Sequence, residues 1–165
     1  MRIGLLFSSL LAIAAFGGPA LAATEKEFIT DAIKGDTSEI VLGQLALSKA
    51  GDGVKNFAKT LIDDHSKGKA EASLVAQKLG LAPPDGVAPE AQKELTKLQR
   101  LSGVAFDQEF ARYMVDDHEK DIAKFRDEAA NGGGDAKQLA EKTLPVLQKH
   151  LEMAKALQAG KQAEQ

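Results

Sequence analysis

The chain has 165 residues, and its 24 acidic and 21 basic side chains give a formal net charge of −3 at pH 7. This balance, with no basic patch, argues against a nucleic-acid partner. The absence of cysteine excludes disulfides, thiolate metal ligands and the lipid-modified N-terminus of bacterial lipoproteins. An aromatic content of only 5%, together with abundant Ala, Leu, Lys and Glu, favours helices over strands.

The first 22 residues have the pattern of an export signal. Arg2 supplies one positive charge, residues 3–16 are apolar, and Ala20-Leu21-Ala22 is a small-residue cleavage site. The apolar run is shorter than the roughly 20 residues of a membrane span, which leaves an uncleaved anchor helix as the alternative. We therefore expect residues 1–22 to be a signal peptide. Residues 23–165 should form one exported, periplasmic domain without a transmembrane span.

Apolar residues recur at helical spacing along the rest of the chain, and clusters of Gly, Pro and Ser separate the periodic segments. The predicted helices cover residues 25–50, 54–79, 90–101 and 104–130, and a last helix follows the glycine turn at 132–134. No segment has the alternating pattern of a strand. The sequence therefore predicts an all-α domain of four long helices and one short one.

The connection between the second and third long helices decides the expected topology. It covers about 23 residues, from Gly80 to Ser102, which is far more than a tight antiparallel turn needs. A connection of this length can cross back along the bundle and carry the short extra helix across one end or along the side. We therefore expect a ferritin-like four-helix bundle in which the second and third long helices are parallel.

A nine-residue pattern occurs twice and ends both times in Asp-Asp-His. Residues 57–65 and 110–118 share five identical positions, and in each case the histidine lies on the apolar stripe of its helix. His150, the third and last histidine of the chain, also lies on an apolar stripe. Asp63 and Asp116, which open the two Asp-Asp pairs, point away from the stripe toward solvent.

Distances along the helices place four polar side chains at one height. Glu39 and His65 each lie 13 residues from Asp52 in the first turn, roughly 20 Å at about 1.5 Å per residue. His118 and His150 lie 15 and 17 residues from the glycine turn at the opposite end, roughly 22 to 26 Å. Since helices of this length span roughly 39 Å, all four belong to one central layer.

Three imidazoles and a carboxylate in one layer are side chains that can bind a zinc, copper or iron ion directly. The predicted ligands are Glu39, His65, His118 and His150. The predicted acceptors for the imidazole N–H groups are Asp64, Asp117 and Asp121. The alternative is a metal-free polar layer in which Glu39 accepts hydrogen bonds from the histidines. A di-iron centre is disfavoured because no histidine follows a glutamate in the spacing Glu-x-x-His.

The same residues carry a resemblance that covers essentially the whole mature chain. Its motifs include Lys55-x-Phe57-Ala58, Phe106-Asp107 and Leu144-Pro145-x-Leu147-x-x-His150. The chain resembles a widespread family of exported bacterial proteins, a domain of unknown function with a ferritin-like bundle that is often labelled a predicted outer-membrane protein. The resemblance implies this fold and an exported location, and it implies no established activity.

The functional hypothesis is an exported bundle that binds a transition metal in metal handling or a stress response. The alternative is a metal-free interaction or envelope-support module, and an enzyme of oxidative metal chemistry comes third. No nucleophile–base pair, phosphate-binding loop or dinucleotide fingerprint is present, so no catalytic residue is predicted. An interaction module needs an exposed apolar patch, whereas a metal protein needs converging ligands.

Overall fold

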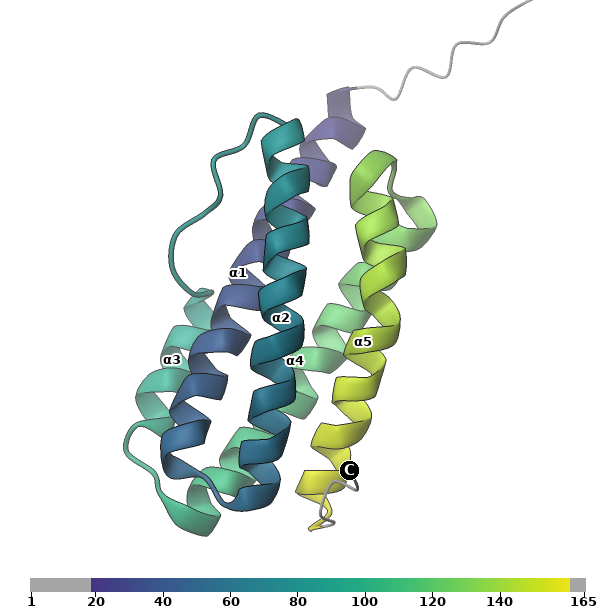
Figure 1. Cartoon of the computed structure of the whole chain (residues 1–165). Coiled ribbons are helices and arrows are strands. Elements are labelled where there is room, and N and C mark those ends of the chain that lie inside the picture. Colours follow the sequence, from purple (N-terminus) through teal and green to yellow (C-terminus); the bar gives the residue numbers. More distant parts are fainter. Residues whose placement is uncertain (1–18, 161–165) are drawn as a thin grey trace, which may run out of the picture.

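The computed structural model describes residues 19–160, and within this range it contains five helices and no strand (Figure 1). The helices are α1 (Pro19–Lys49), α2 (Asp52–Lys78), α3 (Pro89–Leu98), α4 (Gly103–Asn131) and α5 (Gly134–Gln158). The all-α prediction is confirmed. The first helix begins at Pro19, ahead of the expected residue 25. Most of the predicted signal peptide, residues 1–18, lies outside the described residues, so its cleavage stays a prediction.

The four long helices form two antiparallel hairpins, α1–α2 and α4–α5 (Figure 1). From the end of α2 the chain returns along the side of α1, and α3 lies on this return path. The start of α2 lies beside the start of α4, as shown by the backbone N–H of Gly51, which donates to Asp107 Oδ1 over 3.0 Å. Lys78 near the end of α2 forms a 2.6 Å ion pair with Asp135 at the start of α5. The predicted crossover and the parallel arrangement of α2 and α4 are therefore confirmed.

Residues at the crossover end tie the two hairpins together. Lys49 Nζ donates to the carbonyl oxygens of Gln99 and Leu101 over 2.7 and 3.0 Å. Asp107, part of the motif at 106–107, accepts the Gly51 N–H at the turn between α1 and α2. These contacts satisfy backbone groups that helix ends leave without partners. They also hold the end of the crossover against the first hairpin.

Gly43 allows α1 to approach α2 closely. A Cβ at this position would lie 2.9 Å from Ile62 Cγ1 and 3.3 Å from the carbonyl oxygen of Ala58. We expect Gly43→Ala to lower the free energy of unfolding by about 1–3 kcal/mol, because overpacking forces the two helices to shift. Urea denaturation measures the change.

Gly35→Ala in the same helix is the matched control for this prediction. A Cβ at Gly35 would meet only Asp121 Oδ2, at 3.8 Å. Because alanine has a higher helix propensity than glycine, Gly35→Ala should stabilise the protein by up to about 1 kcal/mol. Equal stability of the two variants would contradict close packing at Gly43.

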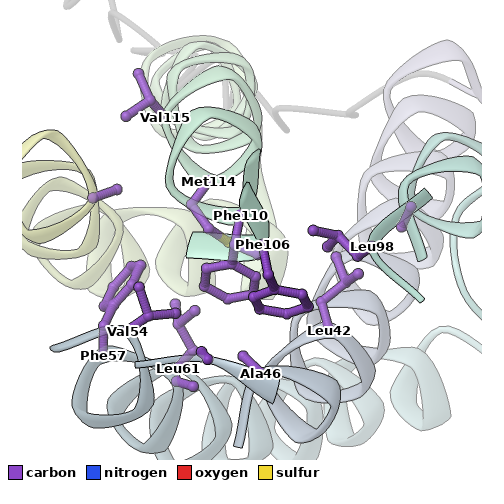
Figure 2. Packing of buried hydrophobic residues seen from close by; sticks show 14 residues of the cluster. Leu42, Ala46, Val54, Phe57, Leu61, Leu98, Phe106, Phe110, Met114 and Val115 are labelled. Atoms are coloured by element: carbon purple, nitrogen blue, oxygen red, sulfur yellow. The ribbon is translucent and has the colours of Figure 1, made fainter. Parts of the chain in front are cut away.

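Two hydrophobic clusters fill the bundle, one toward each end. The first lies near the α1–α2 turn, where the Phe106 and Phe110 rings stack at 5.9 Å and Phe57 packs edge-on to Phe110 at 6.4 Å (Figure 2). The second lies near the α4–α5 turn and includes Ile33 and Phe125. The buried polar side chains between the two clusters are Ser38, Glu39, His65, His118 and His150. The central polar layer predicted from the sequence is therefore present.

Within residues 19–160, none of the helices combines the length and the apolar character that crossing a bilayer requires.

Candidate metal centre

His65, His118 and His150 come from three different helices and meet in the centre of the bundle. They lie on α2, α4 and α5, and their exposed fractions are 5%, 1% and 0%. Their ring centroids are 5.2, 5.4 and 5.9 Å apart, and one ring nitrogen of each lies within 4.8 Å of the others. Among the described residues this is the only such convergence of three or more His, Cys, Asp or Glu side chains.

Each imidazole has one ring nitrogen bound to an oxygen acceptor, which fixes its tautomer. His65 Nδ1 lies 2.8 Å from Asp36 Oδ1, and His150 Nε2 lies 3.2 Å from Asp64 Oδ2. His118 Nδ1 lies 2.9 Å from the carbonyl oxygen of Met114, one turn earlier in α4. Since a carbonyl or carboxylate oxygen can only accept, these three ring nitrogens carry the protons.

The three remaining nitrogens are Nε2 of His65, Nε2 of His118 and Nδ1 of His150. His65 Nε2 is buried and has no hydrogen-bond partner. His118 Nε2 and His150 Nδ1 lie 3.4 Å apart. In neutral rings both atoms of this close pair present lone pairs, with no proton between them. One ring nitrogen from each of the three histidines thus faces the same buried space.

Burial keeps two of these rings uncharged. Burial, together with the charges of the neighbouring His65 and His150, lowers the pKa of His118 to about 3. Burial and the nearby His65 lower the pKa of His150 to about 4, although the hydrogen bond to Asp64 opposes this shift. Both imidazoles are therefore neutral at pH 7. Neutral imidazole is the form that binds metal ions.

Asp36 is a partner of the site that the sequence analysis missed. Burial raises the pKa of its carboxyl, and the hydrogen bond from His65 works against that rise. A Cβ at Gly68 would lie 3.0 Å from Asp36 Oδ1, so the absent side chain makes room for this carboxylate. The available signal was spacing, because Asp36 lies three residues before Glu39 on the same face of α1.

The predicted acceptors divide into two groups. Asp64 accepts a hydrogen bond from His150, as expected. Burial by itself would raise the pKa of the Asp64 carboxyl, but the hydrogen bonds from His150 and Lys67 outweigh burial, and the pKa is lowered. Among the described residues, neither Asp117 nor Asp121 forms a hydrogen bond with an imidazole. Burial, followed by the charge of Asp117, raises the pKa of Asp121 to about 7.

Glu39 lies in the polar layer, but it is not part of the histidine trio. Its exposed fraction is 1%, and neither carboxylate oxygen has a hydrogen-bond partner. Burial raises the pKa of this carboxyl well above its usual value, and the neighbouring charge of Asp117 adds to the shift. The structure therefore brings together three of the four predicted ligands, and Glu39 faces the acidic side of the layer.

The arrangement can hold one transition-metal ion. Imidazole nitrogens bind such ions at about 2.0–2.1 Å, so two ligands of one ion lie at most about 4.2 Å apart. The 3.4 Å separation of His118 Nε2 and His150 Nδ1 meets this limit. The 4.8 Å within which all three ring nitrogens lie is slightly larger, so a bound ion would draw the rings closer together. Each imidazole also donates its other N–H to an oxygen, which is the usual second contact of a metal-bound histidine.

Comparisons with known proteins identify the family of the chain and two structures of similar fold. The sequence model of a family described as "Domain of unknown function (DUF4142)" matches residues 11–157. A crystal structure of a DUF305 fragment from Deinococcus radiodurans is similar, with a TM-score of 0.73 and 14% identity over 82% of this chain and 95% of that one. CopM in the Cu(II)-bound form is also similar, with a TM-score of 0.69 and 19% identity over 82% and 96%. At such identities the two structures show a shared fold. No curated protein matches the chain.

Proposed function

Because the chain belongs to the DUF4142 family, a domain of unknown function, its activity has to be inferred from its site, and we propose that it binds one copper ion through His65, His118 and His150. Copper binding would serve metal handling or a stress response outside the cytoplasm. Export to the periplasm is part of this proposal and rests on the signal-peptide pattern of residues 1–22.

The observation that carries the proposal is the close contact between His118 Nε2 and His150 Nδ1. The two atoms lie 3.4 Å apart, although the other nitrogen of each ring already donates its proton to an oxygen. Two lone pairs facing each other in a buried site repel one another. A cation between them removes this repulsion and also binds the unpartnered His65 Nε2.

The ligand chemistry favours copper over zinc and iron. Nitrogen sites bind divalent first-row metals with affinities that rise to a maximum at Cu²⁺ and fall again at Zn²⁺. The trio supplies three imidazole nitrogens, whereas non-haem iron sites commonly combine two histidines with a carboxylate. The similar fold of CopM, a protein described in a Cu(II)-bound form, adds support.

The metal-free interaction module gains no comparable support. The exposed large hydrophobic residues of the described chain are Leu47, Leu74 and Val104, which come from three different helices. An interaction surface would call for a contiguous apolar patch. Converging ligands are the feature expected of a metal protein.

Copper titration of protein purified without an affinity tag tests the proposal. We expect one Cu²⁺ per chain, with an electron paramagnetic resonance spectrum that shows coupling to nitrogen. Elemental analysis of the untreated protein should report which metal it acquires in the cell. Failure to bind copper or any other transition metal at one ion per chain would overturn the proposal.

Asp36 should act as a positioning residue for His65. We expect Asp36→Ala to lower copper affinity about 10- to 100-fold without changing the stoichiometry, because an outer hydrogen-bond partner orients a ligand without contacting the ion. Competition with a chelator of known affinity measures the change. Asp63→Ala is the matched control, since Asp63 is exposed. An affinity equal to that of the control would contradict the positioning role.

A further inference from the structure

We propose that an acidic cavity between α1 and α4 is the vestibule through which the metal ion reaches His65. This inference rests on the proposed copper binding and adds the route of loading. The cavity has a volume of about 220 Å³. Its walls come mainly from α1 and α4, and Thr143 and Leu147 of α5 close one side.

The vestibule extends from the surface to His65, one member of the histidine trio. Glu27, Asp31 and Asp127 line it and are exposed, so they mark its mouth. Asp36 and His65 also line it, and their side chains are 12% and 6% exposed, so they mark its inner end. His65 also carries the unpartnered buried nitrogen Nε2. A cation that enters the cavity thus meets a ligand of the proposed site at its base.

The charge of the lining suits a cation above all at the mouth, where three carboxylates are exposed. Six carboxylates line the vestibule, against a single lysine, Lys124. Lys124 forms a 3.3 Å ion pair with Asp31 at the mouth, and among the described residues no lysine forms an ion pair with the deeper Asp121 or Asp36. Clefts lined by one sign of charge focus the field and raise association rates of the opposite charge by about 10- to 1,000-fold.

A second cavity reaches His65 from the other side and differs in charge. It has a volume of about 140 Å³ and lies between α2 and α5. Two of its three carboxylates are paired, Asp64 with Lys67 at 3.2 Å and Glu71 with Lys142 at 2.6 Å. These ion pairs cancel most of the negative electrostatic field of this cavity. We therefore assign metal loading to the vestibule between α1 and α4.

Stopped-flow mixing of the metal-free protein with Cu²⁺ tests the route. Tyr113 is the only tyrosine and the chain has no tryptophan, so quenching of its fluorescence by bound Cu²⁺ reports loading. The double variant Glu27→Gln/Asp127→Asn removes two carboxylates at the mouth. We expect its association rate at low salt to fall about 3- to 10-fold, with a weaker dependence on ionic strength. The equilibrium affinity should stay within about twofold of wild type, because neither residue contacts the trio.

Glu71→Gln is the control variant, since it removes one carboxylate at the mouth of the second cavity. It should load at the wild-type rate. Loading slowed by Glu71→Gln and not by the double variant would overturn the route while leaving copper binding intact, and so would equal rates in all three proteins. If wild-type protein binds no metal at equilibrium, both the route and the proposed function fall.

Discussion

Replacing His118 by alanine should lower copper affinity by on the order of 100-fold or more. His118 Nε2 is one of three convergent nitrogens, and the hydrogen bond from Nδ1 to the Met114 carbonyl holds the ring in place. Loss of a direct ligand should exceed the 10- to 100-fold effect of losing an outer partner. Isothermal titration and elemental analysis measure the change.

Two further proteins separate a lost ligand from a damaged fold. Asp63→Ala changes the exposed aspartate of the equivalent repeat and should bind copper as wild type does. Free imidazole added to His118→Ala should restore part of the binding, because the deleted ring leaves a space of its own shape. Equal copper content in wild type and His118→Ala would end the proposal that this trio holds the metal.

Replacing Glu39 by glutamine should stabilise the metal-free protein at pH 8 by about 1–3 kcal/mol, which raises its melting temperature by roughly 3–10 °C. Glu39 is buried, both its carboxylate oxygens lack partners, and the charge of Asp117 lies nearby. An ionised carboxylate in this position costs stability. A neutral amide of the same shape can donate to Asp117 instead.

The sign of the pH dependence follows from the raised pKa of Glu39. The folded protein holds this proton to higher pH than the unfolded chain does. The contribution of protonated Glu39 to the free energy of unfolding is therefore complete below about pH 4.5 and is lost as the pH rises through the folded pKa. The advantage of Glu39→Gln should therefore be largest at pH 8 and shrink toward pH 4.5. Urea denaturation at the two pH values measures it.

Glu152→Gln is the control for this prediction, because it makes the same change in charge at an exposed position. It should alter stability by less than about 0.5 kcal/mol at either pH. A destabilised Glu39→Gln protein at pH 8 would contradict the unpaired, buried state of this carboxylate. If Glu39 were instead the fourth metal ligand, as the sequence predicts, the same variant would lose copper affinity.

The sequence determined which helices form and which residues share the central layer. Apolar spacing and Gly- and Pro-rich breaks located all five helices within a few residues, apart from the start of α1 at Pro19. Counting about 1.5 Å per residue from the turns placed Glu39 and the three histidines at one height, and the structure has them there. These inferences succeed because helical rise and periodicity are local properties of the chain.

Only the tertiary structure decided what each polar residue faces within that layer. His65 and His118 occupy equivalent positions of the repeat, yet His65 donates to Asp36 of α1 and His118 to its own helix at Met114. The equivalent Asp64 and Asp117 also differ, since Asp64 accepts from His150 while Asp117 lies beside Glu39. A helical period fixes the face of a helix on which a side chain lies. The neighbour on that face depends on how the hairpins pack. Since α2 lies between α1 and α5 while α4 packs mainly on α5, the two copies of the repeat meet different partners.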